Sequence, residues 1–202
     1  MRCLNFAVGL SVLILLPFQT GLAFFAESPE KMKSHVTPAV IANVRTLLEK
    51  PIIQLSVAKQ NERLGSISEK EILKLDNQWR SEREANDQPL IAPTLNNPLS
   101  TYLTQIQAGS GGLYTEIFIM DNKGLNVGQS SITSDFWQGD EAKFQKTYPE
   151  GPNAIFIDEP EFHEATKTWR VQLNMTINTA NGTPIGAATF ELNLTELARR
   201  AQ

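Results

Sequence analysis

The stretch "WRVQLNMTIN" at residues 169–178 alternates apolar and polar side chains without a break. Successive side chains of a β-strand point to opposite faces of the sheet, so this alternation predicts a strand with one apolar and one polar face. The dipeptide Asn181-Gly182 follows, which is typical of a tight hairpin turn, and leads into "PIGAATFELNL" at 184–194. The two stretches predict an antiparallel hairpin at the end of the chain.

A glycine cluster, "GSGG" at residues 109–112, marks a change in the spacing of apolar residues. Before it they recur every three or four positions, as in helices, and after it they alternate, as in strands. Strand-like stretches follow at 113–121 and 125–130, joined by the turn "DNKG" at 121–124, and again at 153–162. Helices followed by five strands predict a single α+β domain, whose antiparallel sheet rests one face on the N-terminal helices.

Three local signals place helix ends in the first half of the chain. Thr37 and Pro38 form an N-cap followed by a proline at the first helical position, and Ser68 with Glu71 forms a capping box. Pro51 splits the first helical pattern, because a proline inside a helix removes a backbone donor and clashes with the preceding turn. The apolar stripe around this split consists of Val40, Ile41, Val44, Leu47, Leu48, Ile52 and Leu55.

The first residues are typical of a secretory signal peptide, which predicts a periplasmic protein. Arg2 precedes an apolar run from Phe6 to Phe18, and small residues stand where a cleavage site before residue 24 needs them. The alternative is an uncleaved membrane anchor, but the run is shorter than the ~20 residues that a spanning helix requires. The prediction divides the chain into a cleaved signal peptide at 1–23, a polar, irregular tether at 24–36 and one domain at 37–202.

The composition excludes several kinds of site. The one cysteine, Cys3, lies inside the predicted signal peptide, so the mature chain has no thiol for disulfides, zinc–thiolate sites or thiol catalysis. The net charge of −4 and the lack of a basic patch argue against nucleic-acid binding. His35 and His163 lie in the predicted tether and in a hairpin, so neither has the setting of a catalytic base. We predict no enzymatic activity, no metal site and no cofactor.

The stretch "TSDFWQGDEAKF" at 133–144 belongs to the one long connection of the predicted sheet. Long connections are usually functional or disordered, and the aromatic residues argue against disorder. The rings of Phe136 and Trp137 next to several acids would favour a small cation. Alternatively, Trp137 plugs the core, while Asp140 and Glu141 begin a short helix whose dipole favours acids. The local sequence leaves both interpretations open.

Four stretches carry a family resemblance: "LDNQWRSE" (75–82), "YTEIFIMDNKGLNVGQSSITSDFWQGDEAKFQKTY" (114–148), "AIFIDEPEF" (154–162) and "GTPIGAATFELNL" (182–194). They resemble the Cache, or PDC, sensor domain of bacterial extracytoplasmic proteins. The resemblance covers most of the chain from the first helix onward, and 114–148 is its specific part. It implies a PAS-like fold of the single-Cache type, with a long N-terminal helix and a five-stranded antiparallel sheet. The small-molecule pocket would lie between the sheet and the connection that precedes the third strand.

The resemblance also implies extracytoplasmic sensing of metabolites such as amino acids, carboxylates or amines. Most such domains lie between two membrane helices and drive a kinase, a chemoreceptor or a cyclase, whereas this chain ends at Gln202, shortly after the last predicted strand. We therefore expect a periplasmic protein that binds a small polar, cationic metabolite. It would either signal through a separate, membrane-bound partner or work as a free periplasmic binding protein, and the sequence leaves both alternatives open. By position, the family's pocket would be lined here by Tyr114, Phe118, Asp135, Trp137, Asp140 and Asp158.

A second hypothesis assigns the apolar stripe from Val40 to Leu55 to a partner. In this case the domain would form a homodimer or dock onto a membrane protein, without a ligand of its own. The simpler use of the stripe is packing on the chain's own sheet. A monomer that responds to a ligand favours the first hypothesis, and a dimer without a ligand response favours the second.

Overall fold

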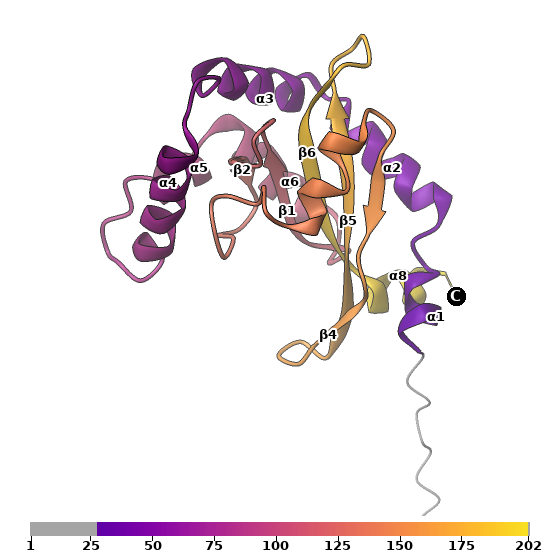
Figure 1. Ribbon diagram of the computed structural model, residues 1–202. Helices are drawn as coiled ribbons and strands as arrows, with labels where there is room; N and C mark the ends of the chain where they lie inside the picture. Colours follow the sequence, from indigo (N-terminus) through magenta and orange to yellow (C-terminus); the bar gives the residue numbers. More distant parts are fainter. Residues whose placement is uncertain (1–27, 202) are drawn as a thin grey trace, which may run out of the picture.

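A computed structural model describes residues 28–201 of the protein, so the predicted signal peptide at 1–23 lies outside the described residues. Helices occupy the first half of the chain and an antiparallel sheet the second half (Figure 1). The helices are α1 (Pro29–Lys33), α2 (Pro38–Leu48), α3 (Pro51–Arg63), α4 (Glu69–Glu82), α5 (Ile91–Leu95), α6 (Pro98–Gly109), α7 (Ala142–Gln145), the 3-10 helix η1 (Tyr148–Glu150) and α8 (Leu194–Arg200). The strands are β1 (Tyr114–Met120), β2 (Asn126–Gln129), β3 (Ile155–Ile157), β4 (Glu161–His163), β5 (Thr168–Asn178) and β6 (Pro184–Asn193).

The sheet has the strand path β2-β1-β6-β5-β3, and β4 pairs with the first part of β5. β5 and β6 form the predicted hairpin, and Gly182 in its turn has a positive φ of 83°, a conformation that favours glycine. The predicted α+β fold is confirmed. The single strand predicted over 153–162 is wrong, because two short strands, β3 and β4, pair with different parts of β5. Pro160 lies between them, and a proline cannot donate to the sheet.

The helix ends follow the local sequence signals. The Thr37 hydroxyl accepts a hydrogen bond from the backbone N–H three residues on, and Ser68 and Glu71 make both bonds of the capping box. Pro51 begins α3 after a break in the helix, so the predicted split is confirmed. The short helices α5 and α8 were not predicted. Five or seven residues show too little periodicity to distinguish a helix from a loop.

Residues 28–36 are not the irregular tether that their polarity predicts. Ser28 caps α1, and the side chains of Met32 and Val36 are buried in the main core. α1 contacts α8, so the two ends of the described chain lie together near one end of the sheet (Figure 1). Only two apolar side chains, Met32 and Val36, anchor this segment in the core. Two positions do not establish a helical period, so the sequence did not reveal the helix.

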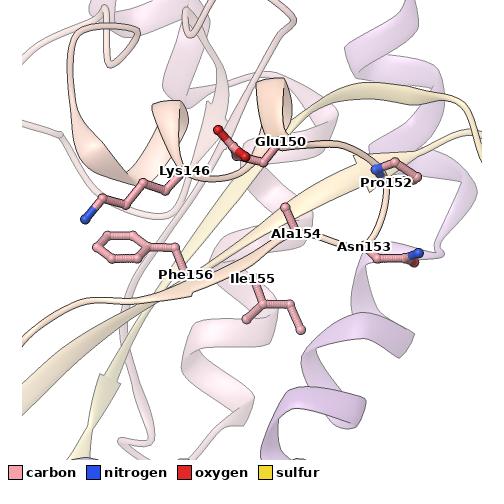
Figure 2. A pocket seen from close by; sticks show the side chains of 7 residues that line it. All are labelled: Lys146, Glu150, Pro152, Asn153, Ala154, Ile155 and Phe156. Carbon is pink, nitrogen blue, oxygen red and sulfur yellow. The ribbon is translucent and has the colours of Figure 1, made fainter.

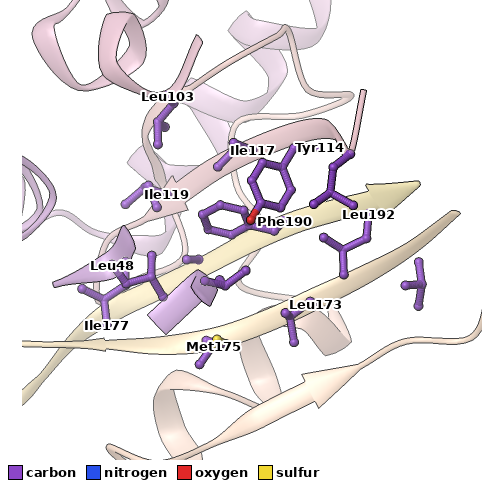
Figure 3. Close-up of a cluster of buried hydrophobic side chains, with 14 of the residues drawn as sticks. Leu48, Leu103, Tyr114, Ile117, Ile119, Leu173, Met175, Ile177, Phe190 and Leu192 are labelled. Atoms are coloured by element: carbon purple, nitrogen blue, oxygen red, sulfur yellow. The ribbon is translucent and has the colours of Figure 1, made fainter. Parts of the chain in front are cut away.

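The main hydrophobic core lies between the sheet and the helices (Figure 3). The apolar face of β5 takes part in this core, as the alternation predicts. Most of the stripe from Val40 to Leu55 also packs on this core, and only Leu55, which is 69% exposed, faces solvent. Core residues at most 5% exposed include Leu48, Leu103, Ile117, Ile119, Leu173, Met175, Ile177, Phe190 and Leu192.

The connection between β2 and β3, which contains α7 and η1, covers the opposite face of the sheet (Figure 1). Phe144 of α7 packs on Phe118 and Met120 of β1, and its ring stacks on Tyr148 at 5.6 Å between centroids. A third apolar cluster, which includes Trp79 and Phe136, joins the same connection to α4. None of the helices within residues 28–201 combines the length and the apolar character needed to cross a bilayer.

Candidate functional site

The six residues that were predicted to line one pocket lie in different parts of the structure. Tyr114 lies on the helix-covered face of the sheet, where its ring meets the edge of Phe190 at 5.2 Å and its hydroxyl accepts a hydrogen bond from Asn43 Nδ2 at 3.3 Å. Burial there raises the pKa of the Tyr114 hydroxyl. Phe118 lies on the opposite face, against α7. The two aromatic side chains of β1 therefore do not line one cavity.

Trp137 has a structural position in the connection. Its indole Nε1 donates to the Lys123 carbonyl at 2.8 Å, and its backbone N–H donates to Asp76 Oδ1 at 3.0 Å. The neighbouring Phe136 ring stacks on Trp79 of α4 at 5.3 Å. Of the two interpretations of this loop, the structure agrees with the core plug for Trp137.

The carboxylates of Asp135 and Asp140 do not converge either. Asp135 accepts hydrogen bonds from Gln138 and Ser134 and lies 3.5 Å from Arg80 Nη2, so its charge has partners within the protein. Asp140 is exposed. The predicted short helix, α7, forms with only four residues. Glu141 is its N-cap residue, but the Glu141 side chain makes no capping hydrogen bond.

A polar cavity of about 220 Å³ lies at the face of the sheet that the connection covers. Asp158 is the one predicted pocket residue that lines it. The cavity is bounded by β5 and β6, by α7 and its cap, and by the segment around β4. Its charged lining residues are Glu141, Lys143, Asp158, Glu159, Glu161, Arg170 and Glu191.

The polar alternation of β5 supplies the centre of this cavity. Arg170 and Gln172 point away from the helices, and Gln172 is paired in register with Glu191 of β6. Arg170 Nη1 donates to Glu191 Oε2 at 3.0 Å, and both side chains are about four-fifths buried. The Thr115 hydroxyl also donates to the same Glu191 oxygen.

Lys143 brings the second positive charge from α7. Its Nζ lies 2.9 Å from Glu141 Oε2 and 3.3 Å from Gln138 Oε1, and 5.4 Å from the centroid of the Phe118 ring. A cation at this distance over an aromatic face is attracted by the ring quadrupole. Phe118 therefore lies near the cavity, and its ring is in contact with Lys143, a cation of the protein itself.

Glu116 is the most perturbed acid near the cavity. It lies on β1 in register with Glu191, and burial raises its pKa to about 7, with a further rise from the negative charge of Glu191. Lys143 and Arg170 lower the pKa and Asp135 raises it, but these effects do not offset burial. Near neutral pH, Glu116 therefore exchanges between its charged and neutral forms.

Glu116 is expected to make the protein less stable as the pH rises. Its folded pKa of about 7 lies above the ordinary 4.5, so the folded state binds this proton more tightly. This stabilisation is fully present below about pH 4.5 and is lost as the pH rises through about 7, a change on the order of 3 kcal/mol. Glu116→Gln should remove this change and unfold at higher urea than the wild type at pH 8. Equal differences between the two proteins at pH 4 and pH 8 would contradict the assignment.

Several buried polar atoms on this face have no hydrogen-bond partner within the described residues. They include Asn126 Oδ1, Gln129 Nε2 and Arg170 Nε, and Asn126 and Gln129 are at most 1% exposed. Buried polar groups are normally paired, so such atoms mark places where water or a ligand supplies the missing partner. From its place in the alternating stretch 169–178, Arg170 is predicted only to lie on the polar face of a strand. The site could have been predicted from a charged residue on the polar face of a strand, combined with a long connection that covers this face.

A wider depression of about 630 Å³ lies on the outer side of the connection (Figure 2). Lys146 lies beside the Phe156 ring, with its Nζ 4.2 Å from the ring centroid, whereas Ile155 points away from this pair (Figure 2). The one aromatic ring in the depression is thus already in contact with a cation of the protein. No group of three or more His, Cys, Asp or Glu side chains between residues 28 and 201 is arranged to hold a metal ion.

No protein-family model and no curated protein matches this chain. Among solved structures, it is similar to the ligand-binding domain of the Pseudomonas aeruginosa PAO1 amino acid chemoreceptor PctC in complex with GABA. That similarity has a TM-score of 0.36 and 14% identity, over 73% of this chain and 60% of that one.

Two further structures show a similar level of similarity. The ligand-binding domain of the Campylobacter jejuni chemoreceptor Tlp3 in complex with L-valine has a TM-score of 0.39 and 14% identity, over 83% of this chain and 65% of that one. The Escherichia coli DcuS sensor domain has a TM-score of 0.38 and 14% identity, over 65% of this chain and 92% of that one. The chain thus spans less than two thirds of the two chemoreceptor domains. All three are described as ligand-binding or sensor domains.

Proposed function

We propose that this protein is a non-enzymatic, extracytoplasmic domain that binds a compact ligand with an ammonium group in the polar cavity. One observation carries the proposal: the charged form of Glu116, an acid beside the cavity, is destabilised by burial and by Glu191. A cationic ligand would stabilise that charged form. The extracytoplasmic location depends on the predicted signal peptide at 1–23, and signalling through a separate membrane-bound partner is part of the same proposal.

The ion pairs of the cavity leave an excess of negative charge. Arg170 is paired with Glu191, Lys143 with Glu141, and Glu159 with Lys33 at 2.8 Å. The other two lining acids, Asp158 and Glu161, have no ion pair within the described residues, and neither has Glu116 beside the cavity. A buried carboxylate without a partner is unfavourable, so a ligand that supplies the counter-charge stabilises the folded protein.

The size of the cavity and the buried Nε of Arg170 narrow the class of ligand. A volume of about 220 Å³ corresponds to about seven water molecules, so it suits a small amine or an α-amino acid. The buried Nε of Arg170 has no acceptor among residues 28–201. A zwitterionic amino acid would satisfy both sides, with its ammonium group near Glu116 and Asp158 and its carboxylate toward Arg170.

Ligand binding is expected to depend on the two acids. A thermal-shift screen over primary amines, α-amino acids and simple organic acids should raise the melting temperature with compounds that carry an ammonium group. Glu116→Gln and Asp158→Asn should each weaken binding about tenfold or more, because each removes a charge-assisted contact of the ligand. Glu62→Gln, which changes an exposed acid on α3, is the matched control and should bind normally.

The pH adds a second readout of the same site. For the wild type, binding of an amine should strengthen as the pH rises through about 7, because Glu116 then loses its proton. For Glu116→Gln this dependence should disappear. Stabilisation by organic acids alone, with no response to amines, would refute the proposed charge of the ligand.

The alternative of a docking module without a ligand has less support. The stripe that it requires packs on the chain's own core, and Leu55 is its one exposed member among the described residues. A single exposed leucine is ordinary on a protein surface and does not indicate an interface.

A further inference from the structure

A groove of about 780 Å³ runs between α3 and the segment 89–98. It shares no lining residue with the polar cavity, so it is a separate site. Val127 of β2 and Phe136 of the connection, both more than 90% buried, take part in its lining, and three prolines belong to the wall opposite α3. The groove therefore offers an apolar surface with a fixed wall.

One face of α3 forms the other wall. The residues of this face recur at helical spacing, and they run about 16 Å along the helix axis. This length fits a medium-chain aliphatic molecule lying along the helix. The residues are Ile52, Ser56, Lys59, Gln60 and Arg63.

The charges in the groove are all positive. Lys59 and Arg63 are one turn apart near the end of α3, and no Asp or Glu lines the groove. Arg63 donates to the Gln60 amide oxygen at 3.1 Å, and neither cation has an ion pair within the described part of the chain. In a protein with a net charge of −4, two unpaired cations beside an apolar surface favour an anionic head group.

The polar side chains of the groove are mostly occupied inside the protein. Gln60 Nε2 donates to Asp121 Oδ2 at 3.0 Å, while Asn97 donates to the Val127 carbonyl at 2.9 Å and accepts from the Ser100 N–H at 2.8 Å. A peptide in this groove would lack partners for its backbone amides, which is unfavourable when they are buried. This favours an occupant whose polar part is confined to one end.

We propose that this groove binds a medium-chain aliphatic carboxylate. Its head group lies between Lys59 and Arg63, and its chain runs along Val127 and Phe136 toward Ile52. The site is independent of the polar cavity, and it carries the opposite charge preference.

Titration calorimetry with hexanoate, octanoate and decanoate tests this proposal on the whole protein. The affinity should rise about two- to fourfold for each added methylene, because each one buries apolar surface. The double variant Lys59→Gln/Arg63→Gln should weaken decanoate binding about tenfold. The matched control, Lys70→Gln/Lys74→Gln, removes two exposed cations of the same spacing on α4 and should bind like the wild type. Ser56→Trp, which fills the groove but keeps both charges, should also weaken binding.

Other results would overturn the proposal. Equal binding of decylamine, or equal decanoate binding by the Lys59→Gln/Arg63→Gln variant, would show that the head group is not recognised. A dimer that this variant dissociates, without any decanoate binding, would assign the groove to a second copy of the chain. Glu116→Gln should leave decanoate binding unchanged, so failure of the proposed amine site and failure of this site can be told apart.

Discussion

Phe190→Ala is expected to lower the free energy of unfolding by about 3–5 kcal/mol, the largest effect of a single substitution that we predict. The Phe190 side chain is fully buried on β6, which lies between β1 and β5 at the centre of the sheet. Its ring makes an edge-to-face contact with Tyr114 of the neighbouring strand β1. Truncation removes buried apolar surface and leaves a cavity that rigid strands on both sides cannot fill. Urea unfolding followed by circular dichroism measures this change.

Phe162→Ala is the control for this prediction. Phe162 is also an aromatic residue of the sheet and also meets another ring, Trp169, at 5.4 Å, but it is 40% exposed on β4. Its truncation should lower the free energy of unfolding by about 1 kcal/mol or less. If the two substitutions have the same effect, the main core is not where the structure places it.

Asp76→Ala is expected to destabilise the protein by about 2–4 kcal/mol, because it leaves buried donors without a partner. Asp76 of α4 is 6% exposed, and one carboxylate oxygen accepts hydrogen bonds from the backbone N–H groups of Phe136 and Trp137 at 2.9 and 3.0 Å. Its other oxygen accepts from Arg80 at 2.9 Å. This carboxylate therefore fixes the connection that also carries Lys143 to the polar cavity.

Asp76→Asn separates the charge from the hydrogen bonds. The amide keeps one acceptor oxygen for the two N–H groups but loses the charge beside Arg80, so we expect a loss of about 1 kcal/mol. Hydrogen exchange gives a local readout, because the N–H groups of Phe136 and Trp137 should lose protection in Asp76→Ala and keep most of it in Asp76→Asn. Equal exchange in both variants would show that these bonds do not hold the connection.

Most elements of the fold could be predicted from neighbouring residues alone. Caps such as Thr37 and Ser68, and breakers such as Pro51, act within one turn of helix, so their effect is independent of the rest of the chain. The alternation of β5 and the Asn181-Gly182 turn are equally local. The failures concern short segments, α1, α5, α8 and the break between β3 and β4, because a few residues do not establish a period.

The candidate site could be predicted only in part. The connection before β3 covers the sheet, and Asp158 is one of the residues that line the polar cavity beneath it. The assignment of Asp158 to a ligand site stays a prediction. The direction of the side chains in the connection was not predictable. Trp137 belongs to the α4 side because Asp76, 61 residues earlier, holds its backbone there. The sequence of a loop gives no information about where such a distant partner lies.

The sequence by itself determined the α+β architecture, the hairpin, the helix ends and the acidic character of the chain, because local backbone preferences and apolar periodicity suffice for these. Only the tertiary structure decided that Glu116 and Glu191 face each other across β1 and β6, with Arg170 and Lys143 beside them. Strand register and burial bring these residues together. The chemistry of the cavity depends on that proximity, since burial next to a like charge is what raises the pKa of Glu116.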